Sequence, residues 1–185
     1  MNLKMPIVFD NDCICSFSWI NRLDIVDKLF TGHIIIPDDV LNEIKKLLKY
    51  KSYQYVFHNI ESKIRNQEYR LERIPILTPY EEEFKSLTDE EKRKNPIGRG
   101  EASAIVIAKY LNGTLASNNL KDVLPHIQPD HPPLITTEII LYLAYQRKII
   151  NFQEGQQILD EMKIRKRKLS TYSFFELLNK YKETD

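Results

Sequence analysis

The fold of this chain is decided by the stretch IGRGEASAIVIAKYLNGTLASNNLKD, which runs over residues 97–122. Within it, the Ala- and Ile-rich residues 102–111 are typical of a helix, and Glu101 falls in the first turn of that helix. An Asn-Gly pair then breaks the helix. Residues 114–117 predict a short buried strand, and two asparagines at 118–119 close it, because their amides favour turns. A carboxylate therefore opens a helix here, and polar amides end a strand.

The composition is that of an ordinary globular protein. The 185 residues are 42% hydrophobic, and the formal net charge of +1 gives no global attraction to nucleic acid. We expect one compact unit, with an α/β domain over residues 1–150 and a C-terminal helical extension over residues 151–185 packed on it. Cys13 and Cys15 are too close in sequence to bridge each other readily, so we interpret them as reduced thiols. We also find no pattern typical of a signal segment or of a membrane-spanning run. Together with the reduced thiols, this lack predicts a cytoplasmic protein without membrane association.

The order of elements along the chain predicts an open sheet between layers of helices. The predicted strands are residues 6–9, 33–36, 69–77, 114–117 and 134–135. The predicted helices are residues 16–30, 38–48, 52–66, a helix starting at Thr78-Pro79, then 102–111, 136–150, 152–167 and 171–181. The strand at 33–36 is continuously apolar, which indicates that helices cover both of its faces. We therefore predict an α/β fold of three layers, with a mostly parallel sheet of four or five strands.

Four oxygen-bearing side chains are predicted to meet at one edge of this sheet. Asp10 and Asn119 follow two strands, whereas Glu43 and Glu101 lie near the starts of two helices. In open parallel sheets, sites form beyond the carboxyl ends of the strands. Carboxylate and amide oxygens suit Mg²⁺ or Mn²⁺, which keep waters and bind substrate phosphates. The pattern therefore predicts a metal site for phosphoryl chemistry.

Each of these residues also has an ordinary structural explanation. Asp10 can cap the helix that follows it, and Glu43 can be a solvated helix acid. Glu101 is favoured in a first turn by the helix dipole whatever the function. The two asparagines can be turn residues, which would leave three acids at the site. It is the joint placement that favours the metal site.

The sequence resembles the PIN-domain nucleases, especially the toxin-type ribonucleases of bacterial toxin-antitoxin pairs and their uncharacterised relatives. The likeness spans nearly the whole chain, because a tail like PLITTEIILYLAYQRKII at residues 133–150 precedes a helical pair in the family. Four further segments carry it: IVFDND at 7–12, IIIPDDVLNEI at 34–44, GRGEASAIVIAKYLNG at 98–113 and LASNNLKDV at 115–123.

This resemblance implies metal-dependent cleavage of RNA by an endoribonuclease that uses Mg²⁺ or Mn²⁺. Asp10, Glu43 and Glu101 match three of the acidic motif positions of the family, which makes them the expected metal ligands and catalytic residues. The resemblance also implies RNA as substrate, a protein antitoxin as partner in toxin-type members, and a homodimer as in many relatives.

The fourth motif position departs from the family. Where the family usually has an aspartate, alignment places Asn119, whose amide oxygen can bind a cation but brings no charge. Asp122 is a candidate replacement if the chain turns helical there, and Asp12 is another from the end of the first strand. The alternative function is a PIN-like fold with a degraded metal site that binds RNA or protein without cleaving.

Two basic regions are further candidates for nucleic-acid contact. Residues 161–183 carry seven bases and three acids. Three tyrosines lie among four lysines near the middle of the chain: Tyr50, Tyr53 and Tyr55 with Lys45, Lys46, Lys49 and Lys51. Stacking and charge neutralisation by such residues would suit a nucleic-acid strand. A solvated helix end and an amphipathic surface explain the two regions equally well.

Overall fold

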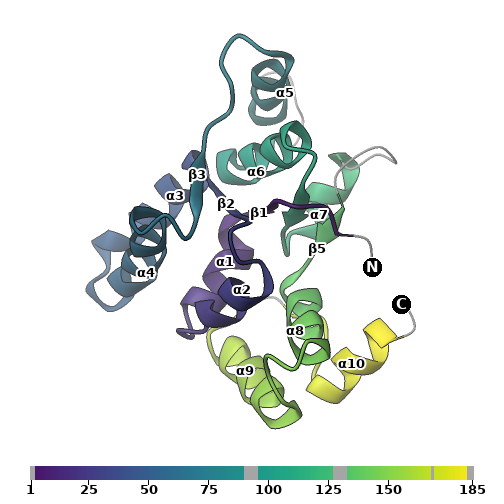
Figure 1. Cartoon of the computed structure of the whole chain (residues 1–185). Helices are drawn as coiled ribbons and strands as arrows, with labels where there is room; N and C mark the ends of the chain where they lie inside the picture. The colour runs from purple at the N-terminus through teal and green to yellow at the C-terminus, as the bar shows by residue number, and fades with distance from the viewer. Residues whose placement is uncertain (1–2, 90–95, 127–132, 168, 183–185) are drawn as a thin grey trace.

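A five-stranded parallel sheet forms the centre of the computed structural model, which describes residues 3–89, 96–126, 133–167 and 169–182. The strand order is β3-β2-β1-β4-β5 (Figure 1). This arrangement confirms the predicted α/β class with an open parallel sheet. The strands are β1 (Ile7–Phe9), β2 (Ile34–Pro37), β3 (Arg70–Glu72), β4 (Thr114–Ala116) and β5 (Leu134–Ile135).

Helices cover both faces of the sheet. α5 and α6 lie on one side in Figure 1, and α1, α2, α8 and α9 lie on the other. The helices are α1 (Asn11–Ser18), α2 (Leu23–Leu29), α3 (Asp38–Lys45), α4 (Gln54–Arg65), α5 (Pro79–Thr88), α6 (Arg99–Tyr110), α7 (Leu120–Val123), α8 (Thr137–Gln146), α9 (Phe152–Ile164) and α10 (Phe174–Lys182). Short 3₁₀ turns are η1 (Lys46–Lys49), η2 (Lys51–Tyr53) and η3 (Leu124–His126).

The central strands are apolar on both faces because each face packs on its own buried cluster. Ile7 and Phe9 belong to the cluster beneath α1, α2 and α8, whereas Val8 belongs to the cluster beneath α5 and α6. Ile35 of β2 joins the second cluster in the same way. Successive side chains of a strand point to opposite faces, so a strand between two helix layers needs apolar residues at every position. This explains the uninterrupted apolar runs.

The predicted helix over residues 16–30 is wrong, because two helices occupy this part of the chain. α1 starts earlier, at Asn11, where the Asp10 carboxylate caps it by accepting a hydrogen bond from the Cys13 amide. Between α1 and α2, Asn21 takes a left-handed conformation with φ of 54°. That conformation interrupts helical hydrogen bonding, although the apolar spacing continues across it.

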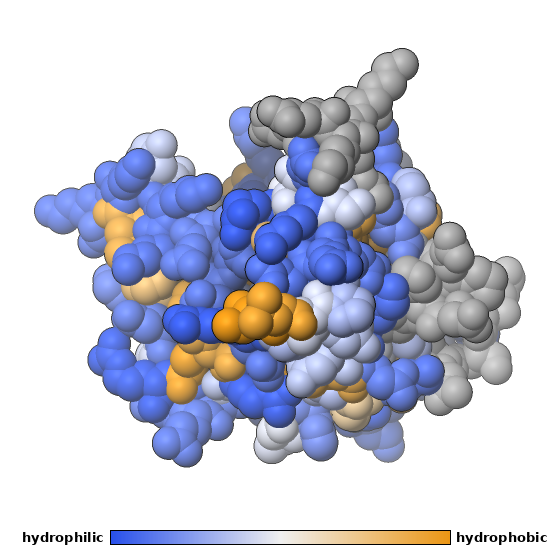
Figure 2. Space-filling view, turned by 90° about the horizontal axis from the view of Figure 1, so that it is seen from above, coloured by the Kyte–Doolittle hydropathy of each residue, from blue (hydrophilic) through white to orange (hydrophobic). Residues whose placement is uncertain are grey.

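The predicted strand over residues 69–77 is also too long. β3 ends at Glu72, and the chain then reaches Leu77, whose φ is 58°. Pro75 cannot donate a ladder hydrogen bond, and Ile76 and Leu77 are 76% and 94% exposed. This β3–α5 connection lies at the top of Figure 1, and the view from that side shows a mostly hydrophilic surface with separate hydrophobic patches (Figure 2).

Two helix starts near the predicted site agree with the sequence. Thr78 caps α5 through its side chain, with Pro79 in the first turn, as predicted. α6 begins at Arg99, three residues before the predicted 102–111, and it places Glu101 in its first turn. The register of α6 therefore directs its first acid toward the carboxyl edge of the sheet.

The C-terminal helices pack on the same buried cluster as α1, α2 and α8. Phe174 of α10 is fully buried in that cluster, and Gly155 of α9 leaves room for its ring, because a β-carbon there would overlap the ring. The division into residues 1–150 and an extension over 151–185 stays a prediction, and residues 168 and 183–185 lie outside the described parts. No helix in the described parts is long and apolar enough to span a membrane.

Candidate metal site

Asp10 lies at the carboxyl edge of the sheet, directly after β1. Its backbone amide bonds to the Ala116 carbonyl at 2.9 Å, which fastens it to the end of β4. The side chain is 4% exposed, and burial raises the pKa of Asp10 from 3.8 to about 7. Hydrogen bonds from Ser117 and Cys13 oppose this rise in pKa, while the charges of Asp12 and Glu101 add to it. Asp10 thus lies near other acids in a desolvated place.

Glu43 of α3 contacts the start of α6. Its Oε1 accepts a hydrogen bond from the Gly100 amide at 2.9 Å, and its Oε2 accepts one from Asn11 Nδ2 at 3.3 Å. A β-carbon on Gly100 would lie 2.5 Å from Glu43 Oε2, so any other residue at position 100 would push the Glu43 carboxylate aside. Glu101 follows Gly100 directly, with its Oε1 buried. The three predicted acids therefore lie at one edge, on elements far apart in sequence.

The side chains of the two asparagines after β4 bond to different partners. Asn118 Nδ2 donates to Thr137 Oγ1 at 2.9 Å and lies 3.5 Å from Asp12 Oδ2. Its Oδ1 accepts from the Thr137 amide at 2.9 Å. Asn119 Nδ2 instead donates to Asp122 Oδ2 at 2.6 Å, in the first turn of α7. Asp122 and Asn119 therefore bond to each other, and the asparagine that contacts an acid of the β1–α1 segment is Asn118.

Arg167 is a residue at this edge that sequence reasoning did not single out. Its Nη1 lies 3.2 Å from Asp12 Oδ1, and its guanidinium stands 5.5 Å from the centre of the Trp19 ring. The basic count over residues 161–183 included this arginine, but no spacing pattern connects it with residue 12. Lys168 and Glu183, which belong to the same count, lie outside the described residues.

Among the described residues, the cysteines belong to no group of side chains that could hold a metal ion. Cys13 and Cys15 are both buried free thiols, as predicted, and burial raises the pKa of each well above 9.0. Uncharged thiols in such surroundings are poor nucleophiles and poor metal ligands. The chemistry of the edge therefore belongs to its oxygen-bearing side chains.

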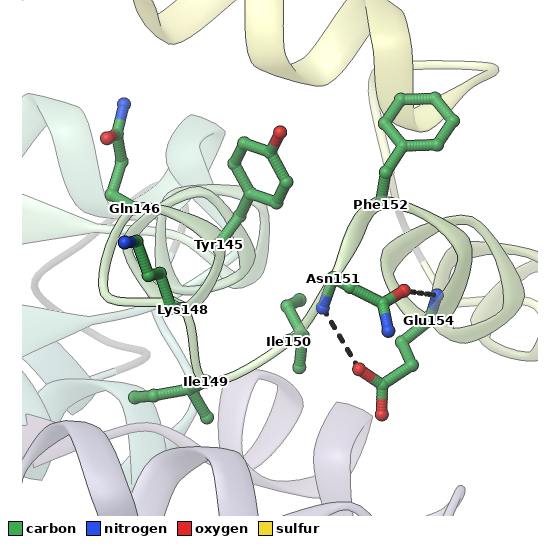
Figure 3. Close-up of a pocket in the computed structure, with 8 residues that line it drawn as sticks. All are labelled: Tyr145, Gln146, Lys148, Ile149, Ile150, Asn151, Phe152 and Glu154. Carbon is green, nitrogen blue, oxygen red and sulfur yellow. Dashed lines mark hydrogen bonds between the residues drawn. The ribbon is translucent and has the colours of Figure 1, made fainter.

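A cavity of about 540 Å³ lies elsewhere, where α8 passes into α9. Figure 3 shows Tyr145 and Phe152 beside it, with Asn151 and Glu154 closing the start of α9 by reciprocal hydrogen bonds of 2.9 Å. Neither Asn151 nor Glu154 is one of the predicted metal ligands. The cavity is a feature of the α8–α9 turn and is separate from the acidic edge.

The donor set at the edge fits a hard divalent cation by residue type. Asp10, Glu43 and Glu101 supply carboxylates, the Asn11 amide contacts Glu43, and the Asn118 amide contacts Asp12. Across the described ranges, no three His, Cys, Asp or Glu side chains lie close enough to hold an ion in their present positions. A bound cation would offset the cost of burying these like charges near one another.

A parallel α/β sheet with acids beyond its carboxyl edge is the architecture that the order of elements along the chain predicted. A family model described as a PIN domain matches residues 6–183. The chain therefore belongs to the PIN-domain family.

Other comparisons give a distant likeness. Among solved structures, the chain is similar to a crystal structure of VapBC2 from Rickettsia felis bound to a DNA fragment from their promoter. The two share 21% identity over 70% of this chain and 97% of that chain, with a TM-score of 0.47. No curated protein shows significant similarity to the chain.

Proposed function

We propose that the protein is a metal-dependent ribonuclease that uses Mg²⁺ or Mn²⁺. The observation that carries this proposal is the meeting of Asp10, Glu43 and Glu101 at one edge of a PIN-domain sheet. Glu43 is hydrogen-bonded to the residue that precedes Glu101, and Glu101 acts electrostatically on Asp10. PIN domains generally depend on divalent metals, and these acids are the ligands such an ion prefers.

The residues of the chain have distinct parts in this proposal. Asp10, Glu43 and Glu101 would hold the metal, which when bound supplies Lewis-acid activation of water and of the phosphodiester. Asn11 and Gly100 hold the Glu43 carboxylate in place through the hydrogen bonds described above. Ser117 and the Cys13 amide orient Asp10 in the same way.

The proposal is tested by RNA cleavage with purified variants in Mn²⁺ or Mg²⁺. Asp10→Asn, Glu43→Gln and Glu101→Gln should each lower the rate at least about 100-fold, because removal of a metal ligand removes several kcal/mol of charge stabilisation. Asp24→Asn, a surface acid paired with Arg22, is the matched control and should cleave normally. Cleavage that EDTA leaves intact, or that all three ligand variants retain, would contradict the proposal.

A second candidate function is RNA or protein binding by a degraded site. The observation that favours it is the pair of asparagines, since Asn118 is fastened to Thr137 and Asn119 to Asp122. Neither brings the charge that a fourth carboxylate would supply.

Two substitutions separate the candidates. Asn118→Asp places a carboxylate beside Asp12, whereas Asn119→Asp places it beside Asp122. We expect the variant that completes the site to bind Mn²⁺ more tightly and cleave faster than the wild type. If neither variant cleaves and RNA binding persists, the binding module is the correct function.

A protein antitoxin and a homodimer stay predictions from the family resemblance. Sedimentation velocity of the purified chain over a range of concentrations tests the dimer. Co-purification of a co-expressed neighbouring reading frame tests the antitoxin. A monomer at every concentration, and no co-purified partner, would contradict these two predictions without affecting the metal site.

A further inference from the structure

A basic segment without acids lies between α3 and α4. Residues 45–53 contain Lys45, Lys46, Lys49 and Lys51, and all four are exposed. Within the described parts of the chain, none of these lysines forms an ion pair, whereas many other surface bases do. The segment therefore presents uncompensated positive charge to solvent.

The apolar residues of this segment account for its anchoring but not for its exposed aromatic rings. Leu47 and Leu48 are partly buried and pack on the main hydrophobic cluster. Tyr55 is also structural, because its hydroxyl donates to the Trp19 carbonyl at 2.8 Å. In contrast, Tyr50 and Tyr53 remain 59% and 36% exposed. The rings of Tyr50 and Tyr53 are therefore accessible to a ligand from solvent.

The exposed rings of Tyr50 and Tyr53 continue a series that begins with the half-buried Trp19 near the acidic edge. Arg167 bonds to Asp12 at 3.2 Å and stands over Trp19 at 5.5 Å. The Trp19 and Tyr53 rings meet edge to face at 4.6 Å, and the Tyr53 and Tyr50 rings follow at 6.3 Å. We call Trp19, Tyr53 and Tyr50 the aromatic track. It leads away from the candidate metal site to the four lysines.

We propose that the aromatic track binds single-stranded RNA next to the scissile phosphate, with unpaired bases on Tyr53 and Tyr50 and phosphates on the lysines of residues 45–53. Arg167 would contact the phosphate nearest the acidic edge. This inference rests on the proposed function in placing the reaction at Asp10, Glu43 and Glu101. Stacking requires exposed base faces, which a duplex hides, so the track selects single strands over duplexes.

Binding is measured by fluorescence anisotropy of a labelled single-stranded oligouridine RNA. The protein carries Asp10→Asn and the buffer contains EDTA, so cleavage does not enter the measurement. Tyr50→Ala and Tyr53→Ala should each weaken binding at least about five-fold, because each removes one stacking platform. Tyr50→Phe keeps the ring and should bind like the parent protein.

The matched control is Tyr110→Ala, which removes a 43% exposed tyrosine at the last residue of α6, the end of that helix away from Glu101. It should change affinity less than two-fold. Circular dichroism checks that Tyr53→Ala still folds, and Tyr50→Ala serves as the independent variant because Tyr50 is the more exposed ring. The proposal is overturned if oligouridine does not bind, or if both alanine variants bind like the Tyr110 control.

The lysines are tested by the salt dependence of the same binding. Replacing the four lysines by glutamine should flatten the slope of log affinity against log salt by up to about 0.7 for each lysine that contacts a phosphate. Lys148→Gln, at an exposed lysine after α8, should leave the slope unchanged. An unchanged slope in the fourfold variant would also overturn the proposal.

A duplex of the same length separates the track from general electrostatic attraction. The alanine variants at residues 50 and 53 should bind this duplex as the parent does; an equal loss for both RNAs would overturn the selection of single strands. If the track variants lose oligouridine binding but no metal supports cleavage, the nuclease proposal fails and the track stands. If cleavage depends on Asp10 while the track variants bind normally, the track fails and the nuclease stands.

Discussion

Asp10 and Glu138 are two buried carboxylates at helix starts, and their surroundings shift the pKa of the carboxyl group in opposite directions. Asp10 caps α1 and is 4% exposed, and Glu138 lies in the first turn of α8 and is 5% exposed. Burial raises the pKa of Asp10 to about 7. The pKa of Glu138 is lowered to about 2, because hydrogen bonds to its carboxylate outweigh the effect of burial.

The donors around Glu138 explain the difference. They come from the segment between α9 and α10 and from α10 itself, so Glu138 fastens the C-terminal helices to α8. They are the Ser170 amide at 2.6 Å, Ser170 Oγ at 2.8 Å, the Thr171 amide at 2.9 Å, Thr171 Oγ1 at 3.1 Å, Lys180 Nζ at 2.9 Å and Tyr181 Oη at 3.2 Å.

Burial of a carboxylate therefore does not by itself indicate function. Glu138 has its compensating charge within the chain and holds the fold together. Asp10 has Asp12 and Glu101 as neighbours, and the effect of burial on its pKa outweighs that of the hydrogen bonds from Ser117 and Cys13. A cluster of that kind favours a cation from outside, which is the property expected of a metal site.

The largest effect should follow from removing the Glu138 carboxylate. Glu138→Ala leaves Lys180 and the amides of residues 170 and 171 without their acceptor, and we expect a loss of about 4 kcal/mol in the free energy of unfolding. Urea denaturation followed by circular dichroism measures this loss. Glu161→Ala, at an exposed acid of α9, should change stability by less than about 0.5 kcal/mol. Equal effects at both positions would contradict the structural role of Glu138.

The same carboxylate predicts an acid-induced loss of stability. Because the folded pKa of Glu138 is depressed, its contribution is fully present above pH 4.5 and is lost as pH falls toward about 2. This loss amounts to roughly 3 kcal/mol. Glu138→Gln should remove this part of the pH dependence, seen by comparing urea midpoints of variant and wild type at pH 6 and pH 3. A variant with the same pH dependence as the wild type would be evidence against the depressed pKa.

A smaller effect is expected at the contact between α3 and α6. Gly100→Ala brings its β-carbon against the Glu43 carboxylate, the end of a flexible side chain, so we expect that carboxylate to move, a change of about 1 kcal/mol in the free energy of unfolding, and weaker metal binding. Gly98→Ala is the matched control, because no atom lies within 4 Å of a β-carbon there. Thermal unfolding and Mn²⁺ titration of both variants test this contact. If Gly100→Ala behaves like Gly98→Ala, Glu43 is not held by the start of α6.

The smallest expected effect is at Asp10, where a substitution should raise the free energy of unfolding, whereas a substitution at Glu138 should lower it. Asp10→Asn keeps a helix cap but removes a charge next to Asp12 and Glu101, so it should stabilise the metal-free protein by about 1 kcal/mol at pH 8. The sign follows because a raised folded pKa costs stability as pH rises from about 4 through about 7. Urea denaturation in EDTA measures it. A destabilisation as large as that of Glu138→Ala would mean that Asp10 is a structural carboxylate too.

Local and periodic patterns allowed most of the sheet to be predicted. Continuous apolar runs located β1, β2 and β4, and the acid after β1 and the one in the first turn of α6 followed from strand ends and helix starts. These features depend on neighbouring residues alone. The prediction of one helix over residues 16–30 was wrong. The cap at Asp10 starts a helix earlier and the turn at Asn21 separates two helices, although the apolar spacing continues across both positions.

The contacts of the site could not be predicted in the same way. Arg167 reaches Asp12 across 155 positions of the sequence, and the donors to Glu138 lie 32 to 43 positions away from it. No periodicity marks such pairs. Likewise, the different directions of Asn118 and Asn119 depend on Thr137 and Asp122, which tertiary packing brings to them.

Titration calorimetry with Mn²⁺ shows whether the acids at the carboxyl edge form a cation site. Wild-type protein should bind Mn²⁺, and Asp10→Asn and Glu43→Gln should each weaken binding at least about ten-fold, whereas Glu161→Ala should bind as the wild type does. The cation site at the acidic edge is contradicted if the wild type binds no Mn²⁺ at millimolar concentration, or if both ligand variants bind Mn²⁺ as tightly as the wild type.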